Sequence, residues 1–216
     1  MPNTPQYVSA LLSTLHFREP RPEGVRTLDR AEWEQLLIFS DRGHLTLIFS
    51  RRCWQYLPTK VQERIARNLV DHAVRLENLR ENYRQIAEAL ARSNAEHLVL
   101  KGFSQWPDFV PDIQLRMQSD LDLYCPGSSL FRARDALLQM GYAFDATPEI
   151  DESDHLPGLV RAGQWRWKGN AFDPEMLPRV ELHYRLWNEP HTCLGPISFG
   201  QFWERRVRRR VGSISF

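Results

Sequence analysis

Two aspartates separated by a single residue, Asp120 and Asp122, carry the clearest chemical signal in this sequence. They lie in the run 119–125, and if that run is a strand, side chains two positions apart project from the same face. Two carboxylates in one small space repel each other, and a bound cation relieves that repulsion. Mg²⁺ is the expected ion, with Mn²⁺ as the substitute, because hard cations take oxygen ligands. For these two residues alone, a solvated edge strand with its acids in water is the alternative.

A third acid follows on a second strand-like run, 179–186. Glu181 and His183 lie on one face of that run, whereas Val180 and Leu182 lie on the other. We therefore expect Glu181 to complete a set of three carboxylates with the Asp-x-Asp pair.

Upstream, a short apolar strand leads into Lys101, Gly102 and Ser104. Glycine and serine after a strand let backbone N–H groups approach a phosphate closely, and lysine adds a mobile positive charge. Arg116 precedes the Asp-x-Asp strand and is assigned to a triphosphate, with a structural salt bridge as the alternative. Ser119, next to the first aspartate, is assigned to the same nucleotide site. The order along the chain predicts a phosphate cradle beside a metal site.

Residues 100–102, 116–123 and 180–186 together resemble the signature of the uncharacterised nucleotidyltransferase family, within the polymerase-β-like superfamily. The resemblance extends in order and spacing over roughly residues 30–216. It is therefore more specific than Asp-x-Asp alone.

The resemblance implies an α+β fold, a small mixed sheet flanked by helices, with Asp120, Asp122 and Glu181 as catalytic metal ligands. It also has a histidine-containing strand before the glutamate strand, which makes His155 a candidate for the rim of the site, together with His183. The sequence departs from the superfamily pattern in its expected phosphate-binding residues. The superfamily usually has adjacent glycine and serine residues closer to the Asp-x-Asp, whereas here the two are separated and lie well upstream.

The activity implied by the resemblance is transfer of a nucleoside monophosphate from Mg·NTP, with ATP as the expected donor, and loss of pyrophosphate. The acceptor is a hydroxyl or phosphate group that the sequence does not identify. In the implied two-metal scheme no dedicated protein base is obligatory. One rival is a nucleotide- or partner-binding module of the same fold that has lost turnover.

The second rival is a nucleic-acid-binding protein that uses the arginines from Arg205 to Arg210, five cations in six positions. The same run suits the C-terminus of a helix, where cations complement the dipole, and this is the favoured interpretation. A net charge of +1 for the chain gives no general attraction to nucleic acid.

Composition describes an ordinary globular chain of 216 residues, 42% hydrophobic and 25% charged. Three cysteines at unrelated spacings favour neither a disulfide framework nor a zinc site, which fits a reducing compartment. No stretch has the pattern of a signal peptide or a membrane span. The expected location is the cytoplasm.

We expect an N-terminal helical region over 1–94 and a nucleotidyltransferase core over 95–216, which continues beyond Phe216 because the chain ends on an apolar, strand-like run. The strongest helix signal covers 59–92, where apolar residues recur every three or four positions. A helix over 130–140 is expected to return the chain as a strand beside the Asp-x-Asp strand.

Overall fold

The computed structural model describes residues 4–145, 154–163, 165, 167–186, 199–211 and 214–216. The chain forms two compact units. The first, called the helical unit here, comprises Met1–Arg75, Asp112–Met117 and Trp167–Pro174. The second, the sheet unit, comprises Leu76–Pro111, Gln118–Arg166 and Glu175–Phe216.

The helical unit is built from short helices around one apolar core. Its helices are α1 (Gln6–Leu15), α2 (Arg30–Arg42), α3 (Thr46–Cys53), the first half of α4 (Thr59–Arg92), and 3-10 turns at Pro22–Thr27, Trp54–Tyr56 and Ile113–Leu115. Helix α2 begins with a capping box, in which the Asp29 carboxylate accepts from the Glu32 N–H at 2.8 Å and the Glu32 side chain accepts from the Asp29 N–H at 3.0 Å.

Helix α4 begins and ends at the predicted residues, Thr59 and Arg92, so the helix expected from the periodic pattern is confirmed. It contributes residues to both units. Asn94 follows it with a φ of 51°, and the N–H of Ala95 donates to the carbonyl of Leu90 at 2.9 Å. This left-handed residue satisfies a free helix carbonyl and turns the chain toward the sheet.

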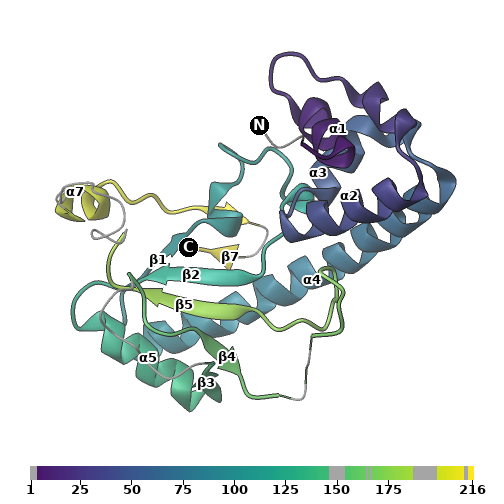
Figure 1. The fold of residues 1–216 in the computed structure, drawn as a ribbon. Helices are drawn as coiled ribbons and strands as arrows, with labels where there is room; N and C mark the ends of the chain where they lie inside the picture. Colours follow the sequence, from purple (N-terminus) through teal and green to yellow (C-terminus); the bar gives the residue numbers. More distant parts are fainter. Residues whose placement is uncertain (1–3, 146–153, 164, 166, 187–198, 212–213) are drawn as a thin grey trace. The chain divides into compact units, whose positions relative to one another are not determined.

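The sheet unit contains a mixed sheet of five strands in the order β1-β2-β5-β4-β3 (Figure 1). The strands are β1 (Leu98–Leu100), β2 (Asp120–Tyr124), β3 (Tyr142–Phe144), β4 (Leu159–Arg161) and β5 (Arg179–His183). β2 pairs in parallel with β5, and the other pairings are antiparallel. The α+β class with a small mixed sheet is confirmed.

One expectation about the order of strands is wrong. β3 follows α5 (Ser129–Gln139) as predicted, but it lies at the far edge of the sheet and not beside β2. The later strand β5 takes the place next to β2 because its apolar residues Val180 and Leu182 match the buried positions Leu121 and Leu123 in register. All four are completely buried, and each contributes roughly 1.5–3 kcal/mol to stability.

The C-terminal part of the sheet unit consists of α7 (Phe199–Glu204) and a two-stranded ribbon of β6 (Arg210–Val211) and β7 (Ile214–Ser215). The ribbon is closed by reciprocal backbone bonds between Arg209 and Phe216, at 2.7 and 3.0 Å. No helix in the described part of the chain is long and apolar enough to cross a membrane.

Candidate active site

The register of two neighbouring strands places the predicted acids together. Asp122 on β2 lies directly opposite Glu181 on β5, and Asp120 lies opposite Arg179. Side chains at paired positions of parallel strands project from the same face of the sheet. The three carboxylates therefore share one surface.

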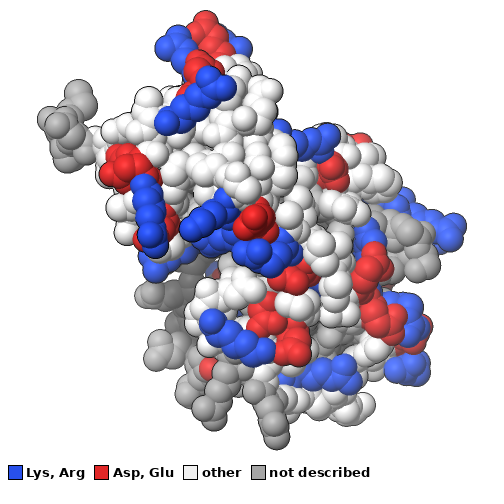
Figure 2. Space-filling view, turned by 90° about the vertical axis from the view of Figure 1, so that its right-hand side faces the viewer, with Lys and Arg blue, Asp and Glu red and all other residues white. Residues whose placement is uncertain are grey.

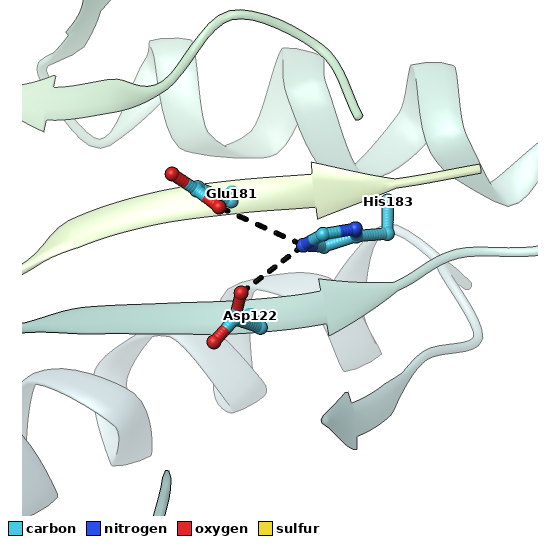
Figure 3. Close-up of side chains that lie close together, drawn as sticks. All are labelled: Asp122, Glu181 and His183. Atoms are coloured by element: carbon cyan, nitrogen blue, oxygen red, sulfur yellow. Dashed lines mark hydrogen bonds and ion pairs between the residues drawn. The ribbon is translucent and has the colours of Figure 1, made fainter. Parts of the chain in front are cut away.

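Asp122 is the most enclosed of the three acids and has two cationic partners. Its Oδ1 lies 2.7 Å from the Nζ of Lys101. The same oxygen lies 3.1 Å from the Nε2 of His183 (Figure 3). Burial alone would raise the pKa of Asp122, but the hydrogen bonds from His183 and Lys101 outweigh it and lower that pKa. Asp122 is therefore held as a carboxylate inside the sheet unit.

Glu181 lies at the centre of a wider group of basic side chains. Its carboxylate oxygens are 3.7 Å from the Nε2 of His183, 3.9 Å from the Nε2 of His155 and 3.5 Å from the Nε of Arg179. The hydrogen bond from His183 lowers the pKa of Glu181 despite partial burial. Figure 3 shows the imidazole of His183 pointing between the two acids.

Asp120 has the opposite electrostatic character. Burial raises its pKa first, and the neighbouring negative charges of Asp122 and Glu181 raise it further. An acid in this position gains most from a cation shared with its neighbours.

His183 is the residue whose importance the sequence analysis missed. We expected it at the rim, but it is buried, with 3% of its surface exposed, and it joins Asp122 to Glu181. These hydrogen bonds overcome the effect of burial and raise the pKa of His183 to about 9. Its spacing of two from Glu181 was the available signal, because both side chains must then share a strand face. His155, also expected at the rim, is half-buried with its ring centre 5.1 Å from that of His183.

The segment after β1 is a tight turn in which two successive residues have positive φ, 54° at Lys101 and 51° at Gly102. Positive φ at a lysine costs roughly 1–2 kcal/mol, which the contact with Asp122 offsets. A Cβ at Gly102 would lie 2.0 Å from the Nε2 of Gln118, so only glycine fits there. Gln118 in turn donates to the carbonyl of Asp120 at 2.7 Å. This contact fixes the turn against the start of β2.

The remaining predicted nucleotide-binding residues have different positions. The Ser104 hydroxyl donates to the Lys101 carbonyl at 2.6 Å, which makes it part of the turn. Ser119 precedes β2 and its carbonyl accepts from the N–H of Arg179 at 3.3 Å. Arg116 belongs to the helical unit, and its buried Nε has no hydrogen-bond partner among the described residues.

The donor set fits a divalent cation. One ligand atom each from Asp122, Glu181 and His183 lies within 4.8 Å of the others, which is close enough for a single ion. Asp120 lies on the same strand face but is not part of this group of three. Carboxylate oxygens suit Mg²⁺ and Mn²⁺, whereas an imidazole nitrogen suits transition-metal ions better than Mg²⁺.

Comparison with known families gave one match. The sequence model of a family described as uncharacterised nucleotidyltransferase matches residues 29–216, which is most of the chain and includes every candidate residue above. Searches of curated proteins and of solved structures found no match.

Proposed function

Because the chain belongs to the uncharacterised nucleotidyltransferase family, we propose that it transfers a nucleoside monophosphate from a metal-bound NTP to a hydroxyl or phosphate acceptor, releasing pyrophosphate. ATP is the proposed donor. The observation that carries the proposal is the direct pairing of Asp122 with Glu181 across β2 and β5, with Asp120 on the same face. Carboxylates arranged in this way suit the positioning and charge neutralisation on which phosphoryl transfer depends.

Each group in the site has a proposed role. Asp120, Asp122 and Glu181 hold the divalent ions, Mg²⁺ or Mn²⁺. When bound, such ions neutralise the triphosphate and lower the pKa of an attacking hydroxyl. Lys101 and the backbone of Gly102 and Ser104 bind the triphosphate, with Arg116 and Ser119 as further proposed contacts.

Before substrate binds, Lys101 and His183 stabilise the negative charge of Asp122. Their nitrogens both contact the Oδ1 of Asp122, at 2.7 and 3.1 Å, and offset the negative charge that would otherwise repel the neighbouring acids. For Lys101 to reach a phosphate it must leave Asp122, and cations that replace it there make this move favourable. The lysine thereby links the binding of cations by the acids to the binding of the triphosphate.

The test is incubation of the purified protein with each α-labelled NTP, Mg²⁺ or Mn²⁺, and a cell extract as the source of acceptor. We expect label to appear in one acceptor together with pyrophosphate, and to be absent with Asp122→Asn. The matched control is Asp135→Asn, which removes an exposed acid from α5. Binding of NTP without labelled product or pyrophosphate would contradict the proposal and identify a binding module without turnover.

A further inference from the structure

A pocket of about 620 Å³ lies in the sheet unit, separate from the carboxylate pairing. Three segments enclose it: the edge strand β1, the second half of α4, and the chain from Arg205 to Arg209 with the terminal residues Ser215 and Phe216. Its volume falls within the range of small-molecule sites, about 300–1,000 Å³. The proposed function assigns nothing to this pocket.

Part of the pocket lining is aromatic and apolar. Tyr83 of α4 is almost completely buried, its ring meets that of Phe216 edge-on at 6.2 Å, and its hydroxyl lies 3.1 Å from the Nε2 of His97. Burial lowers the pKa of His97 and so favours its neutral form. Leu98 and Val99 of β1 line the same pocket. These residues suit a ring or another flat apolar group.

Other lining residues are cationic. Among the described residues, four arginines line the pocket and no acidic side chain does. Asp108 neutralises Arg209, and Arg206 stacks on Trp203 with its guanidinium carbon 4.7 Å from the ring centre. Arg205 and Arg208 are exposed and form no ion pair with any described residue. Unpaired guanidinium groups beside an apolar wall are suited to bind a phosphate in a fork geometry.

The pocket adjoins the candidate active site through the turn after β1. Ser104 lines the pocket, and its hydroxyl donates to the carbonyl of Lys101, whose Nζ contacts Asp122. The turn from Lys101 to Ser104 therefore connects the lining of the pocket to the proposed donor site.

We propose that this pocket binds the acceptor, and that the acceptor is a small phosphate monoester with a ring or apolar body. The ligand's role as acceptor rests on the proposed nucleotidyl transfer, whereas its binding to the pocket does not depend on that reaction. A small ligand is favoured over a nucleic acid because a polyanion needs an extended basic surface. The chain has a net charge of only +1. On the face drawn in Figure 2, which is the side away from α7, basic and acidic side chains are interspersed.

The test is calorimetric titration of the whole chain with phenyl phosphate in EDTA, without nucleotide, so that the result does not depend on metal or turnover. We expect saturable binding that weakens at high salt, and much weaker binding of phenol, which lacks the phosphate. The variant with both Arg205→Gln and Arg208→Gln should bind phenyl phosphate roughly tenfold or more weakly, since each charged hydrogen bond contributes to affinity. The matched control, Arg132→Gln with Arg134→Gln, removes two cations from α5, which does not line the pocket.

Three results would overturn the proposal. Equal binding of phenyl phosphate by the pocket and control variants would remove the arginines from the site. A short RNA that binds far more tightly than phenyl phosphate, with the loss confined to the pocket variant, would assign the arginines to nucleic acid. An equal loss of Mg·ATP binding in the pocket variant would assign them to the donor. Unchanged Mg·ATP binding with weaker phenyl phosphate binding supports the proposal, and failure of the labelling test alone leaves this result unaffected.

Discussion

The two faces of strands β2 and β5 differ completely although they alternate residue by residue. On one face, Leu121, Leu123, Val180 and Leu182 are completely buried. On the other, Asp120, Asp122, Glu181 and His183 collect charge in a small space. The comparison shows that one pair of strands provides both the stability of the sheet and its chemistry, through a period of two.

The contrast also separates two kinds of burial. The apolar face is stabilised by removal from water, so its residues need no specific partners. Asp122 is as inaccessible, with 1% of its surface exposed, but it is stabilised by Lys101 and His183. Substitutions on the two faces should therefore produce different losses.

The largest effect should come from Asp122→Asn on the acidic face. We expect transfer activity to fall by at least about 100-fold, because the variant loses a proposed metal ligand and the partner of Lys101. The free energy of unfolding should fall as well, by roughly 1–3 kcal/mol, since the buried His183 and the more exposed Lys101 both lose a charged acceptor. Pyrophosphate release at a temperature where the variant is fully folded, confirmed by circular dichroism, separates the two effects. Full activity in the folded variant would remove Asp122 from the catalytic group.

On the apolar face, Leu123→Ala should change stability and leave the chemistry intact. A completely buried leucine leaves a cavity, so we expect a loss of about 2–5 kcal/mol in urea unfolding. Mn²⁺ binding by the folded fraction should stay unchanged. Leu138→Ala, at a site on α5 that is 41% exposed, is the control and should cost much less. A Leu123→Ala variant that is stable but does not bind Mn²⁺ would break the division between faces.

Two substitutions of Lys101 separate the effect of backbone strain on stability from the effect of charge on NTP binding. Lys101→Ala and Lys101→Gly both remove the ammonium group and should weaken NTP binding equally, with a smaller loss at high salt. Only glycine adopts the φ of 54° without strain, so the glycine variant should be more stable than the alanine variant by about 1 kcal/mol. Urea unfolding and NTP titration of both variants measure the two quantities. NTP affinity unchanged in both would place Lys101 in a purely structural ion pair with Asp122.

Asp120→Asn should give the contrast to Asp122→Asn on the same strand. Its negative charge faces those of Asp122 and Glu181, so its removal should raise the free energy of unfolding without metal by up to about 1 kcal/mol. Affinity for Mn²⁺ should fall at the same time. Thermal unfolding in EDTA and in MnCl₂ tests both parts, and a variant destabilised in EDTA would show that Asp120 has an attractive partner.

The smallest effect concerns a buried histidine outside the two faces. His72, in the helical unit, faces the ring of Phe172, and burial followed by the charge of Arg75 lowers its pKa to about 4. Because the unfolded chain binds this proton near pH 6.5, stability is full above that pH and falls as the pH drops toward 4. His72→Gln should reduce the slope of the free energy of unfolding against pH in this range, by an amount that corresponds to the uptake of up to one proton on unfolding. An equally steep profile in the variant would assign the acid sensitivity to other groups.

Local pattern was sufficient for much of the fold. The periodicity of α4 and the alternation in β2 and β5 are each determined by neighbours in the sequence, and each is found where predicted. The strand order was not predictable in this way, because β3 and β5 both offer apolar residues and only packing of the whole sheet selects β5.

The candidate site shows the same limit. That Glu181 lies opposite Asp122 is a matter of register, which follows once β2 and β5 are paired. The contacts of Lys101 and His183 with Asp122 depend on a left-handed turn and on burial, and neither is visible in residue spacing. Arg116 was assigned from its proximity in sequence, although it belongs to the other unit.

The parallel pairing of β2 with β5 also has a consequence for the order of folding. Parallel strands cannot be joined by a tight turn, and the intervening chain, which includes α5, β3 and β4, separates Asp122 from His183 by 61 residues. Such non-local pairing forms slowly, because the entropy of loop closure must be lost before the strands gain contacts. During synthesis, the acids on β2 leave the ribosome well before their partners on β5. Divalent ions bound as proposed would therefore stabilise the finished sheet and not the nascent chain, and the candidate active site is completed only with the last strand of its sheet.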